Sequence, residues 1–202
     1  MMPYSNEDKK RVLSFYDGLI EEHGLYNYKA LSWSSERSKD IRLEVLCGVG
    51  DMEGRSLVDV GCGFGDLYGF LQERYGRFTY TGIDINPAII EAAQKKYPGV
   101  DFEVADFGEF AGEGYDYVFA SGALSFKVPD YKKLYFGYIK KMFALSRVAA
   151  AFNMLDKKHH IDDDLFATYT VPEVYEFCSA LSGKIIIRQD YLKRDFTFYL
   201  FH

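Results

Sequence analysis

The sequence has few cysteines and no long apolar run. Its three cysteines, Cys47, Cys62 and Cys178, form no CxxC pair and no metal-ligand spacing. We therefore expect reduced thiols in a protein of the cytoplasm. No apolar segment approaches the ~18 residues that a membrane-spanning helix needs. The polar N-terminus MMPYSNEDKK lacks the pattern of a signal peptide, so the sequence predicts neither secretion nor a membrane partner.

Positive charge is also scarce. The chain has 24 Lys and Arg against 30 Asp and Glu, a formal net charge of -6, and no dense basic run. Such a surface does not attract phosphate backbones, so we expect no nucleic-acid partner. Hydrophobic residues make up 48% of the chain, as in an ordinary globular protein, and 17 Tyr with 17 Phe can line a pocket for a small apolar substrate. Composition indicates no oligomeric state.

The hydrophobic pattern divides the chain at Gly54. Helical spacing predicts helices over 6–20 and 35–47, the second capped by Ser34 or Ser35, and we assign residues 1–54 to an N-terminal helical cap. Short strands then alternate with helices through the rest of the chain, which predicts one domain over 55–202. The expected strands are 56–63, 78–86, 100–107, 115–124 and 147–155, and the expected helices are 66–76, 87–97, 131–146 and 172–183.

The C-terminus departs from this alternation. Residues 184–192 and 195–202 both have strand character and are separated by only two residues, so they should pair as an antiparallel hairpin. The fold class predicted is therefore α/β: a Rossmann-like, doubly wound, mostly parallel seven-stranded sheet with an antiparallel C-terminal strand.

A glycine turn follows the first predicted strand in Asp59-Val60-Gly61-Cys62-Gly63-Phe64-Gly65-Asp66. Such a turn lets the backbone approach a ligand, and the following helix offers N–H groups. Asp84, at the end of the second strand, can accept hydrogen bonds from both hydroxyls of an adenosine ribose. The alternative is that Asp84 only caps the helix beginning at Pro87.

Two kinds of cofactor fit a glycine turn with a downstream acid. Dinucleotide sites prefer a third glycine where this chain has Asp66. A diphosphate is also repelled by carboxylates, whereas Asp59 and Asp66 suit a ligand carrying an ammonium and a sulfonium. We therefore expect S-adenosylmethionine as the cofactor, with Asp59 among the residues that bind it.

Four segments in order, LVDVGCGFGDL, GIDINPAIIEAAQ, VADF and YDYVFASGAL, resemble the successive motifs of class I S-adenosylmethionine-dependent methyltransferases. The resemblance runs from about residue 55 to the C-terminus. It implies that the backbone around the glycine turn faces the methionine part of the cofactor, that one acid binds the ribose, and that the next motifs surround the adenine and the sulfonium. The residues so implied are Gly61, Cys62 and Gly63 for methionine, Asp84 for ribose, Ile85, Asp106 and Phe107 for adenine, and Ala120 and Ser121 beside the sulfonium.

The segment SWSSERS before the first strand resembles a tryptophan-containing loop of a group of small bacterial methyltransferases. That resemblance implies that Trp33 and Arg37 contact the methionine carboxylate or the substrate. The alternative is that Trp33 is a packing residue of the cap.

Two motifs of other methyltransferases are missing, and their absence limits the reactions that we expect. The fourth strand lacks the Asn-Pro-Pro-Tyr type of segment found in methyltransferases of nucleobases and of protein glutamine, and Asp130 stands alone where metal-dependent enzymes carry acidic ligands. We predict no metal and name no catalytic residue. His159 and His160 are candidates for a general base, with a solvated polar loop as the alternative. The predicted function is an enzyme that methylates a small molecule, the alternative being a cofactor-binding but inactive regulatory or partner subunit.

Overall fold

The N-terminal part of the chain is helical. The computed structural model describes residues 3–160 and 164–202 and begins with α1 (Asn6–His23), η1 (Tyr28–Leu31) and α2 (Glu36–Cys47). Ser35 caps α2 by accepting from the Ser38 backbone N–H, and the Ser38 side chain accepts in return from Ser35 N. This reciprocal cap fixes the start of α2 where the sequence predicts it.

The rest of the chain alternates between strands and helices. Its sheet has the order β3-β2-β1-β4-β5-β8-β7, and β8 lies antiparallel between β5 and β7. The predicted fold class is therefore confirmed. The bounds are β1 (Ser56–Val60), α3 (Asp66–Gln72), β2 (Thr79–Asp84), α4 (Pro87–Lys96), β3 (Asp101–Val104), β4 (Tyr115–Ala120), α5 (Tyr131–Leu145), β5 (Ser146–Asp156), β6 (Thr168–Tyr169), α6 (Val171–Ser179), β7 (Lys184–Arg188) and β8 (Asp195–Phe201).

One strand, β6, lies in a segment that the sequence predicts as a loop. On one side β5 pairs with β4 only as far as Phe152, so its last residues extend beyond that neighbour. Leu155 and Asp156 instead pair with the two residues of β6, in parallel. This pairing gives hydrogen-bond partners to backbone groups at the end of β5, which the shorter strand β4 does not reach. It also fixes the chain that leads from β5 to α6.

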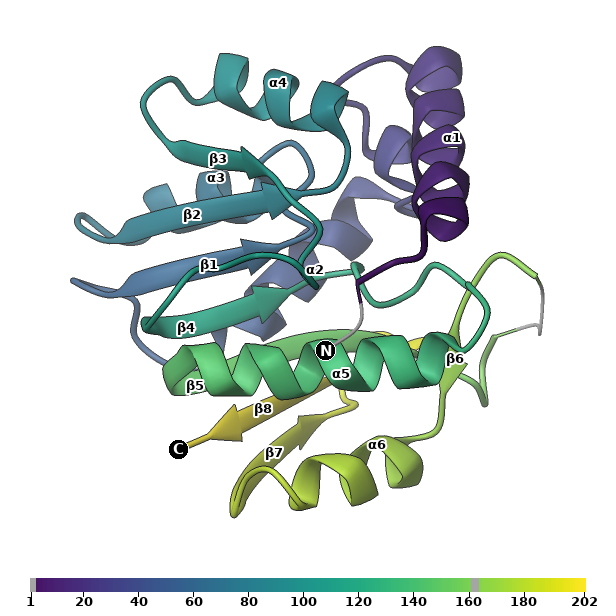
Figure 1. Ribbon diagram of the computed structural model, residues 1–202. Coiled ribbons are helices and arrows are strands. Elements are labelled where there is room, and N and C mark those ends of the chain that lie inside the picture. Colours follow the sequence, from purple (N-terminus) through teal and green to yellow (C-terminus); the bar gives the residue numbers. More distant parts are fainter. Residues whose placement is uncertain (1–2, 161–163) are drawn as a thin grey trace.

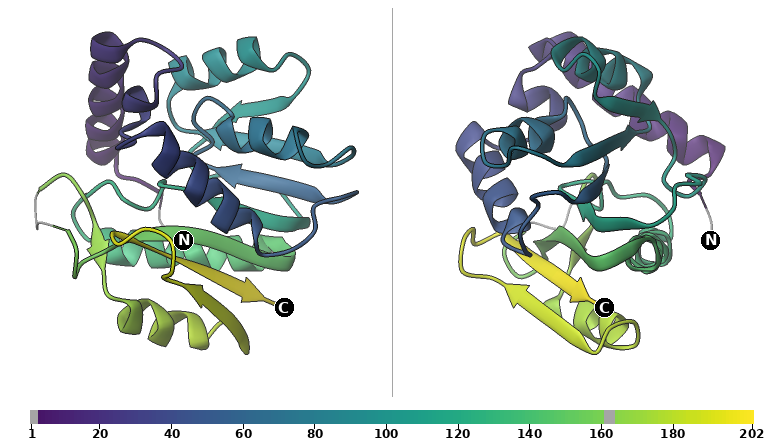
Figure 2. Two further views of the ribbon diagram at one scale, coloured as in Figure 1. Left: turned by 180° about the vertical axis from the view of Figure 1, so that it is seen from behind. Right: turned by 90° about the vertical axis from the view of Figure 1, so that its left-hand side faces the viewer.

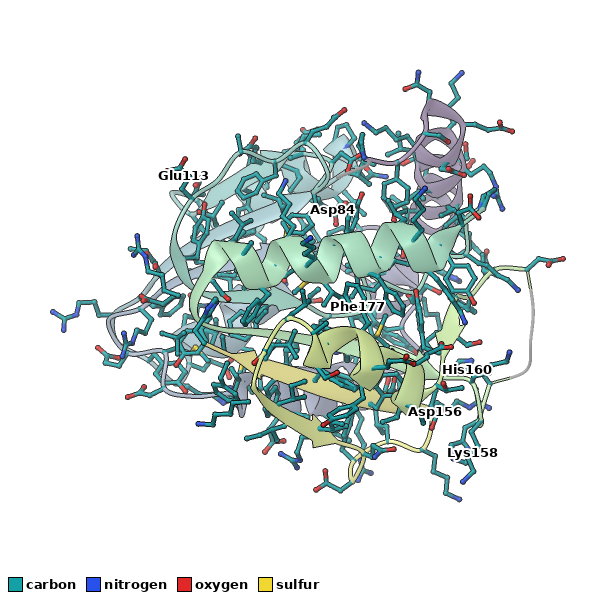
Figure 3. All side chains as sticks on the ribbon, turned by 60° about the horizontal axis from the view of Figure 1, so that its bottom comes forward. Asp84, Glu113, Asp156, Lys158, His160 and Phe177 are labelled. Atoms are coloured by element: carbon teal, nitrogen blue, oxygen red, sulfur yellow. The ribbon has the colours of Figure 1, made fainter. Side chains whose placement is uncertain are left out.

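Helices cover both faces of the sheet. Figure 1 shows α5 and α6 in front of it, and the reverse view in Figure 2 shows α2 and α3 on the other face. Alternate residues of β1 face these two layers: Val58 and Val60 belong to the apolar cluster under α5, and Leu57 to the cluster under α2 and α3. Phe177 of α6 stacks on Phe136 of α5 with ring centroids 4.6 Å apart, and Figure 3 shows Phe177 beside α5.

Helix α1 lies beyond the ends toward which the parallel strands point (Figure 1). A side-chain hydrogen bond of 2.7 Å from Asn86 Nδ2 to Asp17 Oδ1 joins α1 to the start of α4. The cap thereby covers the edge at which open α/β sheets bind their ligands. The division into a cap of residues 1–54 and a domain of 55–202 stays a prediction. In the described part of the chain, no helix has both the length and the apolar character to cross a membrane.

Candidate functional site

A cavity of about 400 Å³ opens at the carboxyl ends of the parallel strands, beneath the cap. Its walls come from the cap, from the ends of β1 to β5, and from the turn between β7 and β8. Of the predicted site residues, it is lined by Trp33, Asp59, Gly61, Cys62, Gly63, Asp84, Ile85, Asp106, Phe107 and Ser121. The structure thus brings together residues that lie up to 88 positions apart in the sequence (33 to 121).

The glycine turn after β1 is shaped by contacts that exclude larger side chains. Gly61 and Gly63 have φ of 71° and 56°, in the left-handed region that favours glycine. A β-carbon at Gly61 would lie 2.6 Å from Ala123 Cβ, and one at Gly63 would lie 2.6 Å from Leu31 Cδ1. The cap, through Leu31, therefore packs directly on this turn.

The N–H groups of the turn are already used within the protein. Those of Gly61 and Cys62 both donate to Ile83 O, at 2.8 and 2.9 Å. That of Gly63 donates to Asp84 Oδ2 at 3.2 Å. A turn that binds phosphate needs such N–H groups free for its ligand. The N–H groups of this turn are therefore not available to a diphosphate. The geometry favours a ligand with positive charge at this place.

Asp59 increases that preference. Its carboxylate is buried below the turn and accepts a hydrogen bond of 2.7 Å from the Tyr80 hydroxyl. Burial raises the pKa of Asp59 to about 7, the Tyr80 hydrogen bond opposes this, and the charges of Asp84 and Asp66 add to it. A cation in the cavity would stabilise the ionised form of this group.

Asp84 retains hydrogen-bonding capacity toward the cavity. Oδ2 accepts from Gly63 N at 3.2 Å, and Oδ1 accepts from Asn86 N at 3.0 Å. The cap of α4 is Asn86, whose Oδ1 accepts from Ala88 N and Ile89 N. Asp84 is therefore not the helix cap of the alternative interpretation. Each oxygen has one described partner and room for another, which fits the two hydroxyls of a ribose.

Asp106 differs from Asp84 because its carboxylate is already saturated. Oδ1 accepts from Gly108 N and the Tyr138 hydroxyl, both at 2.8 Å. Oδ2 accepts from Tyr4 N at 3.1 Å and forms an ion pair of 3.1 Å with Lys9. These four contacts leave no acceptor for an adenine amino group, contrary to what the resemblance implies. Asp106 instead joins the N-terminal segment to the loop after β3.

Of the two residues predicted beside the sulfonium, at the end of β4, only one faces the cavity. Ser121 lines the cavity, whereas Ala120 is fully buried and is not among the lining residues. Asn153 of β5 holds this strand end, since its Oδ1 accepts from Gly122 N and its Nδ2 donates to Ser121 Oγ, both at 2.9 Å. The buried Asn153 is a positioning residue that sequence reasoning missed. Its signal was a single amide inside the apolar run RVAAAFNML.

The predicted arginine is replaced by another on the same helix. Arg37 is exposed and does not line the cavity, whereas Arg42 does. Residues five apart on a helix point about 140° away from each other, so only one of the two can face inward. Arg42 Nη2 donates to the buried Asp195 Oδ1 at 2.5 Å, and its guanidinium carbon lies 4.9 Å from the centre of the Trp33 ring. Among the described residues, its Nε has no hydrogen-bond acceptor.

Only one of the two predicted histidines faces the cavity. His160 lines the cavity and His159 is exposed. Asp162 and Asp163, which follow the pair in the sequence, lie outside the described residues. Within the described part, no three His, Cys, Asp or Glu side chains form a metal-binding group.

Comparison with known proteins agrees with this geometry. Residues 57–142 match the family described as "Methyltransferase domain". The trans-aconitate 2-methyltransferase of Acidovorax ebreus (strain TPSY) is 34% identical over 93 residues, which are 46% of this chain and 36% of that protein. The same enzyme of Rhizobium leguminosarum bv. trifolii (strain WSM2304) is 32% identical over 106 residues, 52% of this chain and 41% of that protein. The chain thus spans about two fifths of the length of the curated relatives it matches.

Solved structures share the fold along the whole chain. The magnesium protoporphyrin IX methyltransferase of Synechocystis PCC 6803 with bound S-adenosylmethionine superposes with a TM-score of 0.69 at 16% identity, covering 98% of this chain and 100% of that one. The 1,6-didemethyltoxoflavin-N1-methyltransferase of Burkholderia thailandensis gives a TM-score of 0.69 at 17% identity, covering 100% and 92%. Residues 57–142 thus match a methyltransferase domain, and the chain shares the fold of solved methyltransferases.

The matched range leaves out several residues that shape the site. Trp33, Arg42, Asn153 and Asp195 all lie outside residues 57–142. Lys141 lies inside and was also missed: its Nζ donates to the carbonyls of Phe107, Gly108 and Phe110 at 2.7, 3.2 and 2.6 Å. Burial lowers the pKa of Lys141, and the charge of Asp106 opposes that effect. Lys141 therefore holds the loop after β3 in place.

Proposed function

We propose that this protein binds S-adenosylmethionine and transfers its methyl group to a small-molecule acceptor. The observation that carries the proposal is the glycine turn, whose N–H groups are consumed internally and whose flanking acids face the cavity. That arrangement suits the ammonium and sulfonium of this cofactor and disfavours a diphosphate. The buried thiols of Cys47, Cys62 and Cys178 fit a reducing compartment, and we place the protein in the cytoplasm.

Each part of the cofactor has residues to hold it in this proposal. Asp84 accepts from the ribose hydroxyls, Ile85 and Phe107 pack near the adenine, and Asp59 faces the ammonium. Arg42, rather than Arg37, pairs with the methionine carboxylate and uses the N–H donor that the protein leaves unpaired. Asp195 positions Arg42, because the buried carboxylate of Asp195 pairs with this partly buried guanidinium and fixes its orientation.

When bound, S-adenosylmethionine would supply a methyl group on a sulfonium for in-line attack by the acceptor, with S-adenosylhomocysteine as the leaving group. The protein has to hold both reactants in line, and positioning alone provides much of the acceleration. Asn153 fixes the strand end at Ser121 and Gly122. Trp33 closes the cavity over the same place, because a β-carbon at Gly122 would lie 3.5 Å from its Cη2. A strong base is needed only for an acceptor that must lose a proton, and His160 is the candidate for that role.

Calorimetry tests the choice of cofactor. We expect S-adenosylmethionine and S-adenosylhomocysteine to bind with micromolar affinity, roughly -8 kcal/mol. NAD serves as the control ligand and should show no heat of binding. Binding of NAD without binding of S-adenosylhomocysteine would contradict the proposal. Formation of S-adenosylhomocysteine in a metabolite extract then separates an enzyme from an inactive cofactor-binding subunit.

Tryptophan fluorescence tests the placement of the cap. Trp33 is the only tryptophan of the chain, so the whole indole emission reports on its surroundings. We expect the emission to change when S-adenosylhomocysteine is added, because the ring lines the cavity beside Arg42. Adenosine, which lacks the methionine part, is the matched control and should have a smaller effect. An unchanged spectrum at saturating S-adenosylhomocysteine would show that Trp33 only packs the cap.

A further inference from the structure

The cavity extends well beyond the residues assigned to the cofactor. Its far part, here called the acceptor lobe, is formed by Leu155 at the end of β5, by Phe166 before β6, and by Leu192, Lys193 and Arg194 in the turn between β7 and β8. Four strand spacings, about 19 Å, separate β2, which carries Asp84, from β8. The acceptor lobe therefore lies across the sheet from the adenosine half of the cavity.

The two halves of the cavity differ in charge. Four of the acids that line the cavity lie in, end or follow the strands β1 to β3: Asp59, Asp66, Asp84 and Asp106. The fifth acid, Asp195, forms a salt bridge with Arg42. The acceptor lobe adds the cations Lys193 and Arg194, and within residues 3–160 and 164–202 neither forms a salt bridge. Among the described residues that line the lobe, these two cations therefore have no acidic salt-bridge partner, in a chain whose net charge is -6.

The walls of the acceptor lobe are otherwise apolar. Leu155 is buried, and Phe166 and Leu192 are half-buried with part of each side chain on the cavity. Apolar walls with a few charged groups at one side are typical of a site that orients a ligand with one charged end. A cationic acceptor would be repelled by Lys193 and Arg194, and a neutral polyol would leave the apolar walls unmatched.

We infer that the methyl acceptor is a small organic anion with an apolar skeleton, held at its charged end by Lys193 and Arg194 and along its skeleton by Leu155, Phe166 and Leu192. This inference rests on the proposed function, since it assigns the acceptor of that same site. Carboxylates and phosphate monoesters share the required charge, and the experiment distinguishes them.

The test measures acceptor binding to full-length protein saturated with S-adenosylhomocysteine. Calorimetric titrations compare hexanoate, phenylacetate and hexyl phosphate with the neutral counterparts hexanamide, phenylacetamide and hexanol. We expect the anions to bind and the neutral compounds to bind at least about 5-fold more weakly. The stronger of hexanoate and hexyl phosphate identifies the class of anion, because the two share one skeleton.

Two double variants locate the effect. K193Q/R194Q removes the two cations from an exposed turn, so we expect the fold to be kept and anion affinity to fall about 5- to 30-fold. K157Q/K158Q removes the same charge from exposed positions that follow β5 and do not line the cavity. In Figure 3, Lys158 lies in the same segment as His160. This control should keep anion affinity within about 2-fold, because exposed charges that make no contact are screened by salt.

The result separates this inference from the proposed function. Equal binding of neutral compounds and anions, no binding of any anion, or unchanged affinity in K193Q/R194Q would overturn the organic-anion assignment. Binding of S-adenosylhomocysteine, titrated first in the same samples, reports on the proposed function alone and should be equal in all three proteins. Its absence would reject the proposed function independently of the acceptor.

Discussion

The variant Asp84→Asn is expected to bind S-adenosylhomocysteine about 10- to 100-fold more weakly, a loss of roughly 1.4–2.8 kcal/mol. Asp84 offers one open acceptor position on each carboxylate oxygen, beyond the hydrogen bonds from Gly63 N and Asn86 N. Two charge-assisted bonds to a ribose are each worth about 1.5–3 kcal/mol, and the amide keeps one acceptor oxygen, so part of the loss is recovered.

The same substitution has a smaller effect on the fold. The amide nitrogen would face one of two backbone N–H groups, both donors, so one hydrogen bond is lost at a cost of about 1 kcal/mol. For a chain of this size that lowers the melting temperature by about 2–4 °C. Because Asn86, not Asp84, caps α4, the helix itself keeps its start.

Asp101→Asn is the matched control for this prediction. Asp101 begins the neighbouring strand β3, is exposed, and does not line the cavity. It loses the same charge and should keep the affinity for S-adenosylhomocysteine. Titrations of the three proteins, with melting curves in the absence of ligand, decide the matter. Equal affinities in wild type and Asp84→Asn would remove Asp84 from the site.

Local patterns were sufficient to predict the sheet. Alternating apolar segments and glycine turns recur from residue 55 onward, and the short link before β8 identified the antiparallel pair. The strand β6 could not be found this way, because two residues carry no periodicity. Its partner is the end of β5, which extends beyond the neighbouring strand β4, and the relative lengths of these two strands are known only from the structure.

Contacts between residues far apart in the sequence determine which residues of the site can bind a ligand, and the motifs do not show these contacts. Both Arg37 and Arg42 lie in a helix with polar residues on several faces, so the sequence does not indicate which one points inward. Asp195, 153 residues further along, pairs with Arg42. Likewise Asp106 has the position of an adenine ligand, but Tyr4 and Lys9 of the N-terminal segment and Tyr138 of α5 fill its acceptors.

The buried Asp59 makes stability and cofactor binding depend on pH in opposite directions. Burial raises its pKa from a usual value near 3.8 to about 7. Below pH 4 the carboxyl is protonated in both the folded and the unfolded chain. Between pH 4 and 7 the unfolded chain loses this proton while the folded one keeps it, so the free energy of unfolding falls as pH rises. A pKa difference of about three corresponds to about 4 kcal/mol above pH 7.

The variant Asp59→Asn should lose this dependence. An amide does not ionise, so the stability of the variant relative to wild type should rise by about 3 kcal/mol between pH 4.5 and 8. The pH slope is the quantity to measure, because any fixed cost of placing an amide beside the Tyr80 hydroxyl cancels between the two pH values. Urea unfolding of both proteins at several pH values gives the slopes.

Ligand binding should show the reverse trend. If Asp59 faces the ammonium of the cofactor, the ionised form binds more tightly, and wild-type affinity for S-adenosylhomocysteine should rise up to about 10-fold from pH 6 to 8. In Asp59→Asn that rise should be absent. Adenosine lacks the ammonium and is the matched control ligand, so its affinity should differ little between the two proteins across this range. Parallel pH profiles for S-adenosylhomocysteine in wild type and variant would show that Asp59 only supports the glycine turn through Tyr80.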